Sequence, residues 1–230
     1  MSALAYAFVL AISVGIPVLS TLVIGFKYRS MFKAFGIGVL TFTLFQVLTR
    51  IPLIQYVLSP NADFVYFSQA NYYLYVLFLS ISAGLFEELG RYLMMKRFIK
   101  EMTLNQALAF GLGHGGIEAL LLIGIPFLLN PDLMQYGPSL AYAGLERISA
   151  LMLHLLFSVL VYQSLQVKSK HKLFLSITLH TLVNFVAIVL LSLTGLTWFV
   201  ELMLLLVALG GLTYIYRQRN LTHEEIIPTL

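Results

Sequence analysis

The sequence predicts an all-α polytopic membrane protein, a bundle of about seven transmembrane helices. Of its 230 residues, 60% are hydrophobic and 10% are charged, whereas soluble domains are usually about 45–50% apolar and about 25% charged. The mean hydropathy is +0.90. We therefore expect a single transmembrane helical domain, residues 1–216, followed by a short, disordered cytoplasmic tail, residues 217–230.

Seven apolar stretches are long enough to cross a bilayer, because about 20 helical residues span roughly 30 Å of hydrocarbon. They cover residues 3–26, 34–58, 72–95, 105–129, 147–166, 172–193 and 196–216. In the first stretch, Gly15 and Pro17 predict a kink that a membrane helix tolerates. The fourth helix is expected to begin after Thr103, because Thr103-Leu104-Asn105-Gln106 has the spacing of a capping box.

The basic residues predict the orientation of the chain. The connectors 59–71, 130–146 and 194–195 contain no Lys or Arg, whereas the other connectors and the tail contain Lys27, Arg29, Lys33, Lys96, Arg97, Lys100, Lys168, Lys170, Lys172, Arg217 and Arg219. By the positive-inside rule, the N-terminus lies outside and the C-terminus lies in the cytoplasm. We expect an integral protein of a bacterial plasma membrane, in contact with membrane lipid.

The net charge of +4 is then a topology signal with some attraction to anionic lipid, so we expect no nucleic-acid partner. The chain contains no cysteine. Disulfides and thiolate metal sites are therefore excluded.

Three charged residues interrupt the third stretch: Glu87, Glu88 and Arg91. Each buried charge near the middle of a membrane helix costs roughly 2.5–3.5 kcal/mol on an insertion scale. Arg91 follows Glu87 by four residues and Glu88 by three, so either carboxylate can pair with it on one helix face. The other carboxylate then needs a partner from another helix. The group is either a functional site or an ion pair that locks helices together.

The second stretch is interrupted by Gln46, Arg50 and Pro52. A membrane-embedded arginine normally faces the bundle interior and pairs with an acid, which here would be a glutamate of the third stretch or Glu118. Arg50 could be a structural counter-ion or a substrate-facing cation.

The fourth stretch is rich in glycine around His114, and Gly111 and Gly115 allow close approach of another helix. His114 and Glu118 are one turn apart and share a face. In the fifth stretch, His154 lies one turn before Ser158, which could hold one ring nitrogen.

The sixth stretch carries a polar stripe, in which Ser176, His180 and Asn184 are spaced by four. Near the outer boundary, Glu146 and Arg147 are expected to form a solvated pair, and Glu201 to reach the interface. Turn signals at residues 130–132 and 137–138 predict a loop over residues 130–146.

The ionisable and amide side chains of four stretches share one depth. Counted at 1.5 Å per residue from the cytoplasmic ends, they lie about 10–20 Å deep. The layer contains Glu87, Glu88, His114, Glu118, His154, His180 and Asn184. Glutamate and histidine without cysteine can bind a metal, relay protons or activate water.

Three motifs resemble those of the CPBP intramembrane proteases, which include the CAAX prenyl endopeptidase: Glu87-Glu88-x-x-Arg91, Phe110-x-x-x-His114 and His180-x-x-x-Asn184. The whole chain is more similar to the YhfC family of glutamic-type intramembrane peptidases, including Gln46-x-x-x-Arg50-x-Pro52. The resemblance covers roughly residues 40–190. The CPBP signature has one more residue before the arginine, and the spacing here is nearer to that of the PrsW-like proteases.

The resemblance implies an intramembrane endopeptidase that cuts a membrane-protein or hydrophobic peptide near the cytoplasmic leaflet. Glu87 would be the general base that deprotonates water with His114, although the sequence leaves Glu88 open for this role. His180 and Asn184 would stabilise the oxyanion, and Glu88 with Arg91 would form an orienting ion pair. The supporting residues would be Gln46, Arg50, Phe110, Glu118 and His154.

A glutamic protease of this kind needs no cofactor. A zinc site formed by Glu87, His114 and His180 is a chemically competent alternative. We expect these three side chains to converge in the cytoplasmic half of the bundle, with Asn184 beside them. A path should lead there from the cytoplasm or from between two helices.

Two other functions are compatible with the residues. In a proton- or ion-coupled transporter the same groups would relay protons, which predicts broken helices at midplane and inverted repeats; the sequence shows neither. In a non-catalytic scaffold subunit the glutamates would be structural, and the sequence identifies no partner subunit.

Overall fold

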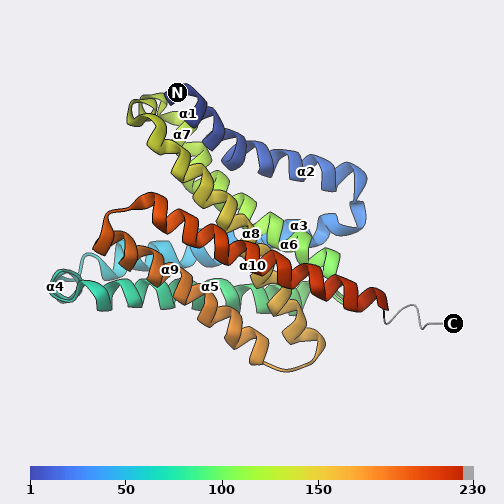
Figure 1. Cartoon of the computed structure of the whole chain (residues 1–230). Coiled ribbons are helices and arrows are strands. Elements are labelled where there is room, and N and C mark those ends of the chain that lie inside the picture. Colours follow the sequence, from blue (N-terminus) through green and yellow to red (C-terminus); the bar gives the residue numbers. More distant parts are fainter. Residues whose placement is uncertain (225–230) are drawn as a thin grey trace.

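The computed structural model describes residues 1–224, and within this part the chain forms helices joined by short connectors (Figure 1). Seven helical segments are long and apolar enough to cross a membrane: Ser2–Lys27, Arg29–Leu58, Tyr72–Phe98, Leu104–Leu129, Pro131–Gln166, His171–Thr194 and Thr197–Arg219. The prediction of an all-α bundle of seven spans is confirmed.

Several spans are composed of more than one helical segment. The first contains α1 (Ser2–Leu10), η1 (Ala11–Gly15) and α2 (Ile16–Lys27), and the second contains α3 (Arg29–Phe42), η2 (Thr43–Arg50) and η3 (Leu53–Leu58). Helix α4 (Ala62–Ala70) leads to α5 (Tyr72–Phe98), the third span. The fourth contains α6 (Leu104–Ala119), η4 (Leu120–Gly124) and α7 (Ile125–Leu129). The last three contain η5 (Pro131–Ser139) with α8 (Leu140–Gln166), then α9 (His171–Thr194) and α10 (Thr197–Glu224).

Four of these segments, η1 to η4, are π-helical, and η1, η2 and η4 each end two residues before a proline. Proline lacks the N–H that the helix ladder requires, and its ring crowds the preceding turn. A local shift to the wider i→i+5 pattern accommodates both effects. The predicted kink near Pro17 takes this form. In the second span the same effect places a widened turn at Gln46 and Arg50.

The helix boundaries differ from the prediction at three places. The connector 59–71 contains α4, whose first turn is capped by the Asn61 side chain accepting from the Phe64 backbone N–H at 3.1 Å. Helix α8 begins at Leu140 and not at residue 147, directly after a turn in which Gly137 adopts φ 68°. Helix α10 continues to Glu224, because residues 217–224 contain neither Gly nor Pro. The predicted tail is thus helical over 217–224, and 225–230 lie outside the described residues.

The capping box at the start of α6 is confirmed, with Thr103 and Gln106 each hydrogen-bonding the other's backbone N–H. The predicted close approach at Gly111 and Gly115 is confirmed, because a Cβ atom there would lie 2.7 Å from the carbonyl oxygen of His154 and 2.8 Å from its ring, both on α8. The crossing of α6 with α3 is equally close. A Cβ atom at Gly113 would lie 2.2 Å from the carbonyl oxygen of Phe35, and one at Gly38 would lie 2.1 Å from that of Phe110. Helices α3 and α6 therefore cross backbone against backbone.

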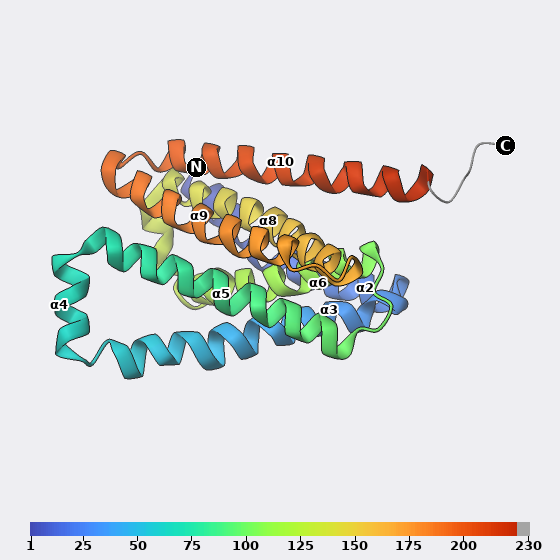
Figure 2. The same cartoon turned by 90° about the horizontal axis from the view of Figure 1, so that it is seen from below.

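Helices α6 and α8 lie at the centre of the bundle, where α6 packs against α3 and α8, and α8 packs against α10; α5 packs against α9. In Figure 2, α4 lies across one end of the bundle and joins the second span to α5. The largest apolar core contains Met95, Phe110, Leu160, Leu173 and Ile215 and fills the half of the bundle nearest the basic connectors. A smaller apolar core, with Tyr6, Val9 and Phe127, lies in the other half.

Candidate active site

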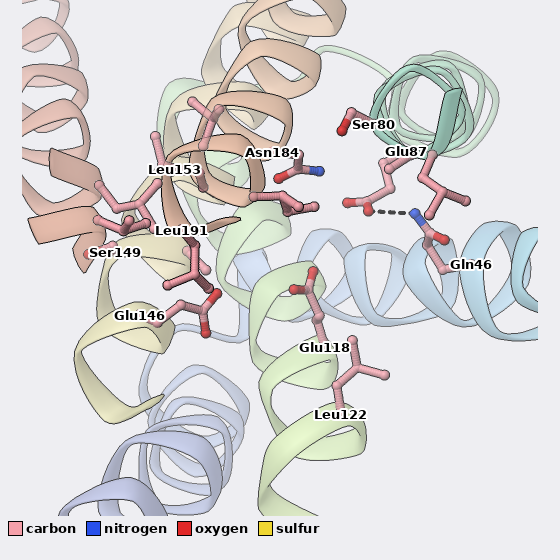
Figure 3. Close-up of a pocket in the computed structure, with 18 of the residues that line it drawn as sticks. Gln46, Ser80, Glu87, Glu118, Leu122, Glu146, Ser149, Leu153, Asn184 and Leu191 are labelled. Atoms are coloured by element: carbon pink, nitrogen blue, oxygen red, sulfur yellow. Dashed lines mark hydrogen bonds between the residues drawn. The ribbon is translucent and has the colours of Figure 1, made fainter. Parts of the chain in front are cut away.

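Glu87 lies at the centre of a buried polar cluster to which η2, α5, α6, α8 and α9 contribute. Its Oε2 is 3.1 Å from Nε2 of His114, and its Oε1 accepts a hydrogen bond from Nε2 of Gln46 at 2.5 Å. Nε2 of His180 lies 3.8 Å from Glu87 Oε1. The structure thus brings Glu87, His114 and His180 together from three separate spans. Asn184 lines the same cavity as Glu87, and Figure 3 shows the two side chains facing one space.

Glu88 lies about 100° around the axis of α5 from Glu87 and is held by three partners. Its Oε2 lies 3.2 Å from Nε of Arg91 and accepts from the Ser176 hydroxyl at 2.6 Å, and its Oε1 lies 2.9 Å from Nδ1 of His180. Glu87 contributes to the cavity wall. Geometry therefore distinguishes the two carboxylates: Glu87 faces the cavity, whereas Glu88 orients Arg91 and His180.

Arg91 also fixes the protonation of His154. Its Nη2 lies 3.2 Å from His154 Nδ1, and its Nη1 donates to the His154 carbonyl at 3.1 Å and to the Ser158 hydroxyl at 2.6 Å. Because a guanidinium has donors only, Nδ1 of His154 is the acceptor and Nε2 carries the proton. The predicted contact between Ser158 and the His154 ring is wrong, since Ser158 binds Arg91 instead.

Glu118 is bound from two sides. Oε2 lies 2.8 Å from Nε2 of His154, and Oε1 accepts from Nη1 of Arg147 at 2.9 Å. Arg147 also pairs with Glu146, but its side chain is only 12% exposed, so the prediction of a solvated pair is wrong. The reason is the earlier start of α8, which brings Arg147 inside the span. Arg147 is a site residue that the sequence analysis missed; the buried charge of Glu118 was the signal that a cation was needed.

Arg50 does not form an ion pair with any residue that the structure describes, so the predicted contact with an acid is wrong. It donates to the Ser82 hydroxyl at 3.0 Å, to the Leu79 carbonyl at 2.8 Å and to Oε1 of Gln46 at 3.2 Å. Gln46 in turn donates to Glu87, so its amide separates the guanidinium from the carboxylate.

Aromatic rings pack against His114 and His180, the two histidines that are candidates for catalysis. Phe42 meets the His114 ring edge-on at 5.4 Å, and the fully buried Phe110 stacks on it at 6.4 Å. Phe157 stacks on His180 at 4.9 Å. Nδ1 of His114 is buried with no hydrogen-bond partner among residues 1–224.

One group of side chains fits a metal ion. Ligand atoms of Glu87, His114, Glu118 and His154 all lie within 4.8 Å of one another. Zinc binds nitrogen and carboxylate oxygen at about 2.0–2.2 Å, so tetrahedral ligands stand about 3.5 Å apart, and these side chains would have to move closer together to bind it. This set differs from the predicted one: His180 turns Nδ1 to Glu88, and Glu118 and His154 take its place.

A cavity of about 460 Å³ begins at Glu87. It is comparable in volume with ligand-binding pockets of other proteins. Its walls include Gln46, Leu79, Leu122, Asn184 and Leu191. These residues belong to the halves of their spans that lie nearest Asn130 and the connectors 59–71 and 195–196 (Figure 3). The cavity therefore extends away from the basic connectors.

Glu201 also lines this cavity. The residue is only 7% exposed, and its Oε2 has no hydrogen-bond partner in the described part of the chain. The prediction that Glu201 reaches the interface is therefore wrong. It lies on the face of α10 that turns toward the bundle.

Comparison with known proteins supports a family relationship. A family model described as YhfC intramembrane metalloprotease matches residues 12–136 and 132–206. The uncharacterized membrane protein YhfC of Bacillus subtilis (strain 168) is 35% identical over 195 residues, which are 70% of this chain and 74% of that protein. No solved structure matches the chain.

Proposed function

The chain belongs to the YhfC intramembrane metalloprotease family, and on that premise we propose that it is an intramembrane endopeptidase acting on a membrane-protein or hydrophobic peptide. The observation that carries the proposal is the placement of Glu87. Its carboxylate lines a cavity large enough for a peptide segment and lies 3.1 Å from His114, well inside the bundle.

Glu87 would act as the general base. A water molecule in the cavity would transfer a proton to Glu87 while its oxygen attacks the carbonyl carbon of the substrate. The same carboxyl would then return the proton to the leaving amine, so that the products are a carboxylic acid and an amine. His114 and Gln46 hold the two carboxylate oxygens and orient them toward the cavity.

His180 and Asn184 would stabilise the oxyanion that forms during attack. Their positions one turn apart on α9 place both near Glu87, and Glu88 holds the His180 ring through Nδ1. The Glu88 carboxylate accepts the hydrogen bond from Nδ1, so Nε2 can donate to the oxyanion only when the ring carries both protons, a state that the nearby carboxylates of Glu87 and Glu88 favour. Preorganised donors of this kind contribute about 10²–10³ in rate in other hydrolases.

Glu87, His114, Glu118 and His154 would hold a metal ion, as the family description suggests. Zinc bound there would supply Lewis-acid activation of the carbonyl and of water. His154 can ligate through Nε2 only when its proton moves, which requires the Arg91 contact with Nδ1 to break. The close pair of Glu87 and His114 supports the metal-free, glutamic version, and the four-residue donor set supports the metal-dependent version.

Substrate would reach Glu87 from the half of the bundle that contains the cavity. The wall there is largely apolar, with Leu79, Leu122, Ile188 and Leu191, so it suits a hydrophobic segment. If the basic connectors are cytoplasmic, this half is the outer one.

The test is cleavage of apolar transmembrane peptides by the purified protein in proteoliposomes, with products identified by mass spectrometry. Glu87→Gln keeps the size of the side chain but removes the base, so we expect it to abolish cleavage and to leave the unfolding temperature close to that of the wild type. Glu101→Gln, in an exposed connector, is the matched control. If the Glu87 variant keeps more than about one hundredth of the wild-type rate, Glu87 is not the base.

A further inference from the structure

Glu201 is a buried carboxylate that the hydrolytic steps do not use. It is 7% exposed, lines the cavity, and has an Oε2 without a partner among the described residues. An unpaired acceptor in such a place is destabilising, and more so when it is charged. A ligand that donates a hydrogen bond to Oε2 would remove this cost.

The charges around the cavity favour a cation. Four carboxylates line it, from Glu87, Glu118, Glu146 and Glu201, together with one guanidinium, from Arg50. Arg147 adds a second positive charge, but it is already bound by Glu118 and Glu146. Glu146 acts on Glu201 as a like charge and Arg147 as an opposite one. Carboxylates thus outnumber the cations, and the excess includes the one whose oxygen is unpartnered.

The cavity combines spaced carboxylates with an apolar wall. Figure 3 shows Glu87 and Gln46 on one side of the space, Glu146 on the other and Glu118 between them. Apolar side chains of Leu153, Leu191, Val200 and Leu204 also contribute to the wall. An alkyl chain could lie against these groups while its charged end meets Glu201.

We propose that the Glu201 part of the cavity is a subsite for a positively charged amino group of the substrate, either a lysine side chain or a free α-amino group. This deepens the proposed peptidase function and rests on it for the statement that the bound molecule is a substrate. A compact ammonium suits a single open carboxylate oxygen, whereas an arginine fork prefers to bind both oxygens at once. The subsite would select peptides with an amine at a set distance from the bond that Glu87 cleaves.

The test measures binding apart from cleavage, using protein that carries Glu87→Gln throughout. Four short Leu-rich peptides compete with a labelled lysine peptide for binding. Three have both termini blocked and carry a central Lys, norleucine or Glu. The fourth carries a central norleucine and has a free α-amino group. We expect at least one amine to bind about tenfold tighter than blocked norleucine, because a charge-assisted hydrogen bond is gained. The two amines show which source the subsite prefers.

Adding Glu201→Gln should reduce this preference to less than about twofold, whereas adding Glu101→Gln should leave it unchanged. Glu201→Met is the second variant if the first does not fold. Affinities of both amine peptides equal to that of blocked norleucine, absence of binding, or a preference that survives loss of Glu201 would each overturn the subsite. If the preference is present but the wild-type protein cleaves no peptide, the subsite stands and the peptidase proposal fails.

Discussion

Arg91 lies fully buried against Glu88, with Nε 3.2 Å from Oε2 and neither side chain exposed. The pair joins α5 to two other helices. Arg91 also donates a hydrogen bond to Ser158 on α8, and Glu88 also contacts Ser176 and His180 on α9. The ring of His180 and the tautomer of His154 both depend on this contact. The ion pair therefore positions the site without facing the cavity.

Arg91→Ala should strongly destabilise the protein. It leaves Glu88 as an uncompensated charge in a low-dielectric interior, a loss of about 3–5 kcal/mol. Thermal unfolding in detergent measures the effect, and Arg97→Ala on the exposed face of the same helix is the control. Equal unfolding temperatures for the two variants would show that Arg91 has no counter-ion role.

Gly38→Ala should destabilise the α3–α6 crossing, because the added Cβ would lie 2.1 Å from the Phe110 carbonyl oxygen. Displacing the backbone costs about 1–3 kcal/mol and moves His114, one turn beyond Phe110. Gly36→Ala on the same helix meets no atom within 4 Å, so it should be neutral or slightly stabilising. Unfolding temperatures of both variants check this, and a harmless Gly38→Ala would argue against the close crossing.

Metal analysis distinguishes the two donor sets. If zinc binds, the purified protein should contain about one ion per chain, and His114→Ala or His154→Ala should lose it. His180→Ala should retain the ion, since the structure directs His180 to Glu88, and the exposed His171→Ala serves as control. Loss of metal in the His180 variant but not in the His154 variant would restore the set predicted from the sequence. Cleavage without metal and insensitive to a chelator would support the glutamic version.

The orientation of the chain can be measured directly, because the protein contains no cysteine and each single substitution introduces one thiol. We expect Ser59→Cys to react with a membrane-impermeant maleimide in intact cells, and Glu101→Cys to react only after permeabilisation. Both positions are exposed. The opposite labelling would reverse the topology and place the cavity in the cytoplasmic half.

Much of the architecture could be predicted because its causes are local. Span length, the capping box at Thr103 and Gln106, and the reach of Arg91 to a carboxylate three residues earlier depend on hydropathy and helical periodicity. Counting residues along each span also placed the polar groups at a common depth, which limited the candidate site to a few side chains.

The pairing of those side chains was decided by the tertiary structure. Depth says nothing of how each helix is rotated about its axis or which helices are neighbours. Glycines allow α6 to pack closely against α3 and α8. The early start of α8 places Arg147 beside Glu118. The same packing buries Glu201 and leaves Arg50 to reach Glu87 through Gln46. These contacts depend on surfaces from distant segments meeting, and no local spacing in the sequence encodes them.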